Sequence, residues 1–570
     1  MDRNLVLALV LSVLIIVVFQ LYMQAVSPPP AKKAPAKKEA VQPPKPTQAR
    51  EAVEPGAPPS GPPQAELEPG KTREVPVAAV TEAKEVKVTV DSPLYEAVLS
   101  SRGGRIISFK LKNYLINLNG GAPVNLYDPQ GPDTGGPTIM LTRADETLND
   151  AGLPYQCLSE QNSISLKEAG AKKSITFKTT TSAGLTLTKT YTFFADRYAV
   201  DFSYSMTNDT QESRNYLVSL PWSKVYKGEG NDQFAWNSAE ILLNGELKDY
   251  YFKDIRGDEE PSGKIQWGGL GDAYFFTALV FQDRPAHKVT LFKPKGDGVA
   301  QMWLRYGSLD LPPGKPVDLN LVVYLGPKER AALAEAGHDL SRALYYSNYV
   351  LLDVMSEYLM KFLRITHNGF QASSIKVPGT GNWGLDIIIL TVLIKILFIP
   401  LTHTSMKSMK RMQEIQPEIA KLREKFGNDK QALNKATMDL FKQYKVNPLG
   451  GCWPMFLQLP VFIALYQTLS YAIELRHAYF LCVPSIFLCI KDLSAPDPYY
   501  ITPILMGGSM VLQQWMTPTT GDPMQKKMML LMPVVFTYLF LTFPSGLVIY
   551  WLVSNILSIG QQLITNKLPQ

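Results

Sequence analysis

The chain has 570 residues and a mass of 63.5 kDa, which is enough for several domains. Apolar residues are concentrated in residues 5–24 and about 383–565, and this excludes a wholly soluble protein. The net charge of +6 is small for the length and gives no indication of nucleic-acid binding.

The first predicted element is a membrane-spanning anchor within residues 1–24. Leu5 to Met23 is almost uninterrupted Leu, Val, Ile and Phe, and about 20 such residues span a hydrocarbon core of ~30 Å. A cleaved signal peptide is the alternative. The apolar run is longer than a usual signal-peptide core, and only Arg3 precedes it as a basic residue. A retained anchor is therefore favoured.

Residues 25–78 are predicted to be a flexible linker. Residues 28–70 hold thirteen of the 43 prolines and no aromatic residue. Such a segment buries too little apolar surface to offset the entropy lost on ordering, so an extended tether is expected.

Residues 79–345 are predicted to form a large antiparallel β-sandwich. Apolar and polar residues alternate with a period of two, and turn clusters such as Arg102-Gly103-Gly104 separate the runs. A scaffold or partner-docking role is favoured over a cleft for a sugar or peptide. The residues expected to point inward are Val86, Val88, Val90, Ile107, Phe109, Leu111, Leu185, Leu187, Tyr191, Phe193, Val200, Phe202, Tyr204 and Met206.

Residues 346–381 are predicted to hold an amphipathic helix and a connector. Between 349 and 364, helical spacing brings apolar residues onto one face, and charged residues lie elsewhere. Either this helix lies in the membrane interface or it packs against the β domain. The apolar face consists of Leu351, Leu352, Met355, Leu359, Phe362 and Leu363.

Residues 382–570 are predicted to form a core of five membrane-spanning helices. Apolar stretches occupy 383–403, 452–473, 499–517, 528–543 and 545–565. The loop 404–446 carries ten Lys or Arg and five acidic residues, and the loop 518–527 carries two lysines. The positive-inside rule places both loops in the cytoplasm. Six spans in total then leave both termini cytoplasmic and the β domain outside.

The cytoplasmic loop 404–446 is predicted to be a helical hairpin. Met406, Met409 and Met412 recur at steps of three, next to Lys410 and Arg411. Because methionine is flexible and polarizable, this basic, methionine-rich stripe suits contact with varied apolar partners. Ordinary packing within the hairpin is the alternative.

One cation, Lys395, stands among aliphatic residues in the second predicted span. It lies about seven residues from the cytoplasmic end, which is ~10 Å at helical rise. A central lysine costs about 2.5–3.5 kcal/mol and normally faces water or a bundle interior. Thr391 and Thr402 share its helix face, and the last predicted span carries a matching polar stripe. Lys395 is predicted to line a hydrated hollow with Thr391, Thr402, Gln458, Trp551, Ser554, Asn555, Ser558 and Gln562. The alternative is that Lys395 reaches the interface and the small polar residues hold helices together.

No metal, cofactor or catalytic site is predicted. Four cysteines form no CxxC pair, five histidines are scattered, and no GxxxxGK[ST] loop is present. Cys482 and Cys489 lie in an outer connection, where a disulfide or two free thiols are both consistent with the sequence.

Several motifs in one order resemble the YidC/Oxa/Alb family of membrane protein insertases, in its Gram-negative form. The resemblance covers the whole C-terminal region, and the layout of anchor, tether and β domain is also similar. The motifs are Asn382-Trp383-Gly384, Pro400-Leu401-Thr402, Asn447-Pro448-Leu449-Gly450-Gly451-Cys452, Asp497-Pro498-Tyr499-Tyr500, Phe543-Pro544-Ser545-Gly546-Leu547 and Val553-Ser554-Asn555.

The resemblance implies a substrate groove, and this chain departs from the family pattern in two of its residues. The family carries an arginine at the position of Lys395, so an electrostatic role is retained but the bidentate fork is lost. Trp551 stands where a tyrosine is often found, and Thr391 matches a substrate-facing threonine. The chain ends soon after the last span, which argues against ribosome docking through a long basic tail.

The predicted function is therefore a membrane protein insertase and chaperone of the bacterial inner membrane, not an enzyme. Its implied partners are nascent membrane proteins, the lipid bilayer, the Sec translocon, the ribosome and the signal-recognition receptor. An anion transporter or channel and a membrane-anchored periplasmic scaffold are the alternatives.

Overall fold

The computed structural model describes a defined part of the chain. The predicted anchor (1–24), nearly all of the predicted linker (25–78) and the motif at 447–452 lie outside it. The described residues are 73–74, 85–118, 121–127, 135–144, 146–159, 161–225, 237–292, 299–347, 349–372, 375–426, 429–444, 453–483, 488–516 and 523–567.

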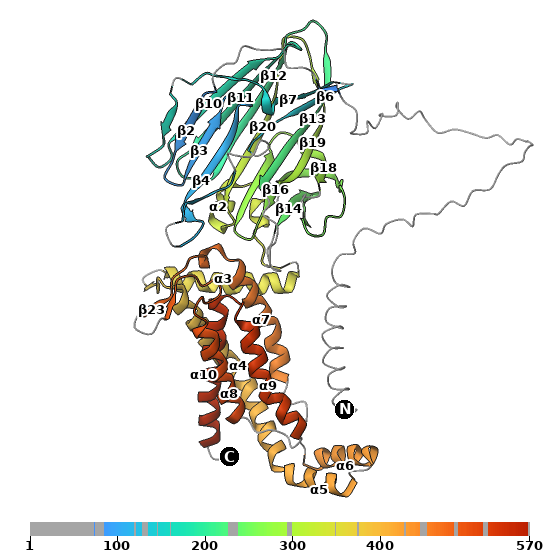
Figure 1. Cartoon of the computed structure of the whole chain (residues 1–570), viewed down its shortest axis with the longest axis vertical. Coiled ribbons are helices and arrows are strands. Elements are labelled where there is room, and N and C mark those ends of the chain that lie inside the picture. The colour runs from blue at the N-terminus through green and yellow to red at the C-terminus, as the bar shows by residue number, and fades with distance from the viewer. Residues whose placement is uncertain are drawn as a thin grey trace, which may run out of the picture. The chain divides into compact units, whose positions relative to one another are not determined.

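The N-terminal half of the described chain forms two β-sheets that are almost entirely antiparallel (Figure 1). In the larger sheet the main path runs β1-β7-β6-β13-β19-β18-β16-β17-β20-β12-β11-β10-β8, and β14 and β15 extend it beside β16. Its strands are β1 (Arg73–Glu74), β6 (Met140–Arg143), β7 (Glu146–Asn149), β8 (Gln156–Cys157), β10 (Lys172–Thr180), β11 (Leu185–Phe194), β12 (Ala199–Asn208), β13 (Arg214–Val225), β14 (Ser238–Leu243), β15 (Glu246–Tyr251), β16 (Ser262–Gly271), β17 (Phe275–Phe281), β18 (Ala286–Phe292), β19 (Val299–Leu311) and β20 (Pro316–Pro327).

The smaller sheet packs on the larger one through a shared apolar core. Tyr95 lies 4.5 Å from Phe109 in the smaller sheet and 6.3 Å from Phe193 in the larger, measured between ring centroids. Alternation along β11 and β12 buries every second side chain, as expected for strands with one face on a core. The strands, in order β5-β4-β3-β2-β9, are β2 (Lys87–Asp91), β3 (Tyr95–Ser100), β4 (Arg105–Leu115), β5 (Pro123–Asn125) and β9 (Ser163–Ser165); a short 3₁₀ helix η1 (Asp150–Gly152) follows β7.

A connection of short elements leads from the sheets to the helical region. It comprises α2 (Arg330–Ala336), the 3₁₀ turn η2 (Leu340–Ala343) and α3 (Val350–Asn368), followed by the hairpin β21 (Gly369–Ala372) and β22 (Ile375–Pro378). The buried face of α3 overlaps the predicted apolar face but is shifted from it. Leu352 and Leu363 are buried as predicted, Ser356 and Met360 are buried beside them, and Leu351 is 69% exposed. Ser356 donates to the carbonyl of Ala464, and this hydrogen bond draws that face onto α7.

Five helices, α4, α7, α8, α9 and α10, pack into one bundle (Figure 1). Each coincides with a predicted apolar stretch. By length and composition, Trp383–Glu414 and Ser545–Thr565 qualify as membrane spans among the described residues, and Leu530–Phe540 is a shorter apolar helix. The β domain and helical region are therefore confirmed, whereas the count of six spans stays a prediction. The helices are α4 (Trp383–Glu414), α7 (Trp453–Tyr471), α8 (Ile501–Met516), α9 (Pro523–Phe540) and α10 (Ser545–Lys567), and the 3₁₀ turn η3 (Ile473–Leu475) follows α7.

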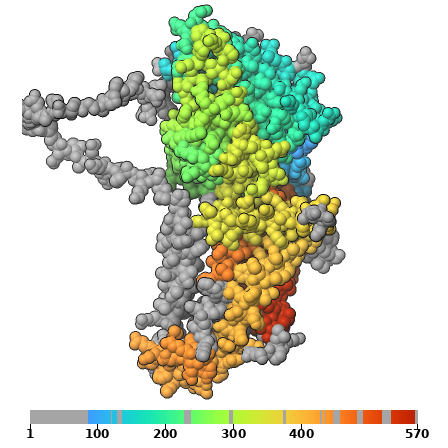
Figure 2. Space-filling view, turned by 180° about the vertical axis from the view of Figure 1, so that it is seen from behind, coloured from blue at the N-terminus to red at the C-terminus, as the bar shows by residue number. Residues whose placement is uncertain are grey.

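The predicted hairpin consists of α5 (Gln416–Phe426) and α6 (Lys430–Gln443), which pack against each other beyond the end of α4. In the space-filling view these orange segments stand out from the end of α4 (Figure 2). Helix α4 itself continues through Pro400 as far as Glu414. The hairpin is therefore shorter than predicted, because its first turns belong to α4.

The short strands β23 (Leu481–Val483) and β24 (Leu488–Ile490) form an antiparallel pair between α7 and α8. Their register places Cys482 directly opposite Cys489. Opposite residues of an antiparallel pair have Cα atoms ~4.5–5.5 Å apart, a range that a disulfide accepts. The sequence alternatives of a disulfide and two thiols therefore both stand.

The turn between β16 and β17 contacts the segment that follows α7. Tyr274 donates its hydroxyl to the carbonyl of Ser470 over 3.0 Å. The guanidinium of Arg476 lies 5.7 Å and 5.6 Å from the ring centroids of Tyr274 and Phe275. Ile473 is buried in the core of the β domain. The two halves of the described chain thus share an apolar and aromatic contact.

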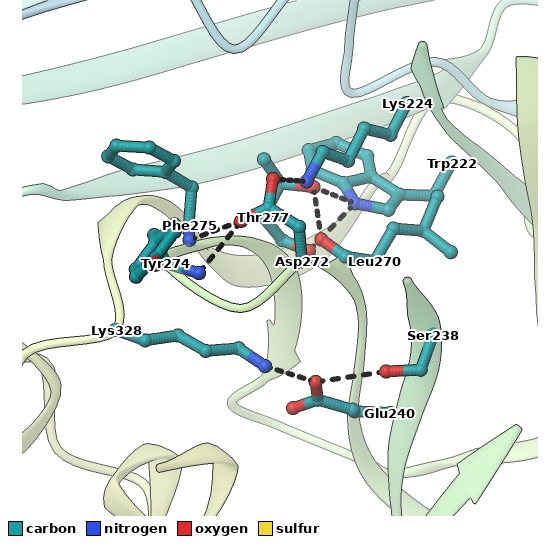
Figure 3. Close-up of polar contacts among 10 residues, drawn as sticks. All are labelled: Trp222, Lys224, Ser238, Glu240, Leu270, Asp272, Tyr274, Phe275, Thr277 and Lys328. Atoms are coloured by element: carbon teal, nitrogen blue, oxygen red, sulfur yellow. Dashed lines mark hydrogen bonds and ion pairs between the residues drawn. The ribbon is translucent and has the colours of Figure 1, made fainter. Parts of the chain in front are cut away.

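An aspartate holds the β16–β17 turn in shape (Figure 3). Asp272 accepts the backbone N–H groups of Tyr274 and Phe275, each over 2.8 Å. Lys224 on β13 pairs with the other carboxylate oxygen over 2.7 Å. This network fixes the two aromatic residues that Arg476 contacts.

Candidate functional site

Lys395 lies on the side of α4 that faces α10. Its Nζ donates to Oγ of Ser558 over 2.6 Å. Ser558 in turn donates its hydroxyl proton to the carbonyl of Ser554 over 2.9 Å. Because the proton of Ser558 is already engaged, its oxygen is oriented to accept from the ammonium group.

The charge of Lys395 is left without a counter-ion. Among the described residues, no carboxylate forms an ion pair with this ammonium group, whose partner is the neutral hydroxyl of Ser558. A hydroxyl dipole orients an ammonium group but does not cancel its charge. The site therefore holds a positive charge whose hydrogen-bond partner is a neutral hydroxyl.

A second polar contact joins the same two helices. Nε2 of Gln561 donates to Oγ1 of Thr402 over 2.9 Å. Thr402 is seven residues from Lys395, and Gln561 is three residues from Ser558, so both pairs lie on the α4–α10 contact. Ser558, which belongs to the predicted polar stripe, and Gln561, which does not, thus hydrogen-bond to the polar side chains of α4.

Thr391 does not open onto this contact. It is fully buried, and its hydroxyl donates to the carbonyl of Ile387 on its own helix over 2.6 Å. Such back-bonding satisfies a threonine hydroxyl in an apolar environment without any ligand. Thr391 shares the helix face of Lys395, as its spacing predicts, but its polar group points back along the helix.

The predicted polar residues of α10 point to two different neighbours. Asn555 donates to Oγ of Ser509 on α8 over 2.9 Å, and Gln562 donates to the carbonyl of Met516 over 2.7 Å. Ser554 accepts from Ser558 and is buried. The α10 stripe therefore divides into one part facing α4 and another facing α8.

Trp551 packs in an aromatic cluster rather than beside Lys395. Its ring lies edge-on to Phe462 at 4.9 Å and to Phe540 at 5.2 Å, measured between centroids. Phe536 lies 6.2 Å away. Gln458 is half-buried on α7. These two predicted site residues thus lie in other parts of the bundle, Trp551 in the aromatic cluster and Gln458 on α7.

The predicted cytoplasmic contact residues all lie on the last turns of α4. Met406, Met409, Met412 and Lys410 are half-buried, and Arg411 is exposed. The methionines therefore use part of their surface for packing, which is the alternative that the sequence left open, and keep part accessible.

Sequence reasoning included Ser558 in the polar stripe but missed Gln561 and Ser509. Ser558 is the partner of Lys395, Gln561 of Thr402 and Ser509 of Asn555. Gln561 could have been found from the sequence, because it is three residues after Ser558 and therefore lies on the same face of the helix. Within the described ranges, no group of three or more His, Cys, Asp or Glu side chains is placed to hold a metal ion.

Two family models match the chain. The model described as the 60Kd inner membrane protein matches residues 375–570, and the model described as the YidC periplasmic domain matches residues 87–361. The first contains the whole α4–α10 contact, and the second contains the β domain and most of α3.

The chain is also similar to full-length relatives. "Membrane protein insertase YidC" of Syntrophus aciditrophicus (strain SB) is 37% identical over 581 residues, which cover 100% of both chains. The protein of the same name from Citrifermentans bemidjiense is 39% identical over 490 residues, covering 84% of this chain and 85% of the relative. A solved structure of an active YidC insertase with its first transmembrane domain resolved has 18% identity and a TM-score of 0.35, and the match covers 87% of this chain and 95% of that one.

Proposed function

This chain belongs to the family of YidC membrane protein insertases, and from that membership we propose that its α4–α10 contact receives the polar tails of nascent membrane proteins. The chain is an insertase rather than an enzyme, and it is an inner membrane protein with a periplasmic domain. The observation that supports the proposed site is Lys395, whose partner is the uncharged Ser558.

In the proposed mechanism, the flanking polar tail of a client enters a hydrated hollow from the cytoplasm. An acidic tail is attracted to Lys395, and water in the hollow shortens the low-dielectric path that its charges must cross. With the outside positive, each acidic residue moving outward gains about 2.3 kcal/mol per 100 mV.

The apolar segment of the client then moves from the edge of the hollow into lipid. Removing apolar surface from water contributes about 25 cal/mol per Å². No nucleotide is required, because the membrane potential and burial of the segment drive the step. The half-buried methionines at the end of α4, with Lys410 and Arg411, are proposed to meet the client first.

The proposal includes the topology and the division of the chain. Residues 1–24 form an anchor, 25–78 a linker, 79–345 the periplasmic β domain, 346–381 an interfacial helix and connector, and 382–570 the five-helix core. Both termini are cytoplasmic.

Exposed apolar side chains on α3, such as Val350, Leu351 and Tyr358, support contact of this helix with the membrane interface. The Sec translocon, the ribosome and the signal-recognition receptor are proposed partners.

Labelling of two cysteine variants in membranes tests whether the hollow is wet. We expect a water-soluble maleimide to label Lys395→Cys, because thiolate forms only where water is present. Leu397→Cys is the matched control, since Leu397 is on the same helix and is 74% exposed on the side expected to face lipid. Equal labelling of the two variants, or none at position 395, would contradict a hydrated hollow.

Removal of the Ser558 hydroxyl tests whether this residue positions Lys395. Ser558→Ala is expected to slow insertion of an acidic-tailed client about three- to tenfold, from a hydrogen bond worth ~0.5–1.5 kcal/mol, and Ser558→Thr is expected to restore it. A neutral-tailed client should be unaffected. Ser509→Ala removes a comparable bond to Asn555 and serves as the control. An equal loss for both clients would indicate a purely structural role.

Reconstitution distinguishes an insertase from the two alternative functions, an anion transporter and a periplasmic scaffold. Proteoliposomes that hold the purified full chain and no other translocation factor are expected to insert one purified client. Uptake of a small anion that Lys395→Ala abolishes would instead favour a transporter. Loss of all insertion after deletion of residues 80–340, in a chain that also carries polar replacements at Ile473 and Arg476, would favour the periplasmic scaffold.

A further inference from the structure

Two acidic residues of the β domain face each other across a hairpin, far in sequence from the proposed insertion site. Glu240 on β14 and Asp249 on β15 are directly opposite in the antiparallel register. Side chains of opposite residues on one face lie about 4.5–5.5 Å apart at Cβ, so like charges there repel. Glu240 is fully buried, and Asp249 is half-buried.

A lysine pairs with one of the two carboxylates, that of Glu240 (Figure 3). Lys328, which follows β20, pairs with Oε1 of Glu240, and Ser238 donates to the same oxygen over 3.3 Å. The other oxygen of Glu240 and Oδ1 of Asp249 are buried and have no hydrogen-bond partner among the described residues. These two buried acceptors lie on directly opposed strands, where one shared proton would supply the hydrogen bond that both lack.

The surrounding charges do not neutralise the second carboxylate. The groups that act on the pair are Lys328, Tyr345 beside Asp249, and Ser238 and the more distant Lys224 beside Glu240. With one nearby ammonium and two carboxylates, the fully ionised pair would leave one negative charge in a buried site, which is costly.

Burial and the opposing Glu240 carboxylate raise the pKa of Asp249 to about 7. Burial also raises the pKa of Glu240, against the attraction of Lys328. Two interacting acids of this kind titrate as a unit. The pair therefore retains a proton at pH values where exposed aspartates have lost theirs.

The pair lies where the β domain meets the connection to the helical region. Lys328 stands between β20 and α2, and Tyr345 stands between η2 and α3. Gly271 permits this arrangement, since a Cβ there would lie 3.1 Å from Cε of Lys328 and 3.2 Å from Oε1 of Glu240. A change in the charge of the pair would act directly on the contact between the β14–β15 hairpin and Tyr345.

We propose that Glu240 and Asp249 form a binding site for one proton, shared between the two carboxylates, and that its release loosens the β14–β15 hairpin from the connection into α3. The donor is the protonated carboxyl, the acceptor is the facing carboxylate, and release passes the proton to water. The stability of this end of the β domain then follows the pH of the compartment in which the domain lies.

The direction of the effect follows from linkage. A carboxyl whose pKa is higher in the folded than in the unfolded state binds more protons when folded, so stability falls as pH rises. The stabilisation is complete below the unfolded-state pKa of about 4, and it is lost progressively as the pH rises to the folded-state pKa. With a folded pKa of about 7, the local opening equilibrium of the hairpin is expected to rise about tenfold between pH 6 and pH 8.

Hydrogen exchange of the full chain in detergent micelles tests the proposal. After correction for the intrinsic pH dependence of exchange, protection of residues 238–251 is expected to fall about tenfold from pH 6 to pH 8, while β11 and β12 stay constant. Asp249→Asn, which mimics the protonated acid, should abolish the fall. Asp258→Asn is the control, because Asp258 is exposed, and it should behave as the wild type.

Three outcomes would overturn the proposal. The first is a pH-independent hairpin in the wild type, which needs no variant to establish. The second is an Asp249→Asn variant that retains the full pH dependence. The third is a midpoint that moves when sodium chloride is replaced by choline chloride, since that would identify a metal cation rather than a proton as the ligand. Glu240→Gln should lower protection at every pH, because Lys328 loses its partner.

Discussion

Replacement of Lys395 by glutamate is expected to lower insertion of acidic-tailed clients by about tenfold or more, whereas Lys395→Arg should stay close to the wild type. Two unit charges 4 Å apart interact by about 4 kcal/mol at an effective dielectric constant of 20, and 1.4 kcal/mol corresponds to a factor of ten. Reversal of the charge turns this attraction into repulsion.

The measurement is the initial rate of insertion in proteoliposomes, with paired clients that differ only in the charge of the tail. A client with a neutral tail provides the control, since its rate should change little in either variant. Equal rates for Lys395→Glu and Lys395→Arg with the acidic client would remove the electrostatic part of the mechanism.

The second large effect is expected at a buried ion pair of the β domain. Lys189 and Asp150 are essentially unexposed and pair over 2.8 Å. Lys189 also donates to the carbonyls of Gly103 and Pro137. Burial lowers the pKa of Lys189, because it disfavours the charged form. The Asp150 carboxylate and the two carbonyls stabilise that charge. Asp150→Asn should therefore lower the free energy of unfolding of the β domain by about 3–5 kcal/mol.

A double variant separates the loss of the pair from the presence of an unpaired charge. Asp150→Asn with Lys189→Met is expected to recover much of the stability, because no buried charge remains. Pulse proteolysis of the full chain in urea provides the measurement. Lys248→Met is the control, since it removes an exposed pair with Glu246 and should cost below about 1 kcal/mol. An Asp150→Asn variant as stable as this control would contradict the prediction.

The strands could be predicted from their period wherever that period is unbroken. All the inward-pointing residues predicted in β11 and β12 are buried. Ile107 was predicted inward and is instead the extra residue of a bulge, since Val98 pairs with Ser108 and Leu99 with Ile106. A bulge shifts the phase by one residue, so Ile106 takes the core position. The alternation of apolar and polar residues in the sequence does not reveal where such a bulge occurs.

The candidate site could be predicted in position but not in its contacts. Hydropathy identifies Lys395 because a cation among aliphatics has few structural explanations. Helical spacing places Asn555 and Ser558 on one broad face, yet one binds Ser509 on α8 and the other receives Lys395 from α4. Their partners depend on the packing of three helices, which no single helix pattern specifies. Ser356 shows the same limit on α3, where a hydrogen bond to α7 sets the buried face.

The position of Ile473 has a consequence for minimal versions of this insertase. Ile473 follows α7 but is buried with the residues of the β domain, and Arg476 lies against Tyr274 and Phe275. Excision of the β domain would expose the buried Ile473 to water and would remove the aromatic side chains that cover the guanidinium of Arg476. A truncated insertase therefore needs polar replacements at Ile473 and Arg476. Without them, a loss of insertion would reflect the newly exposed surface and not a role of the β domain in insertion.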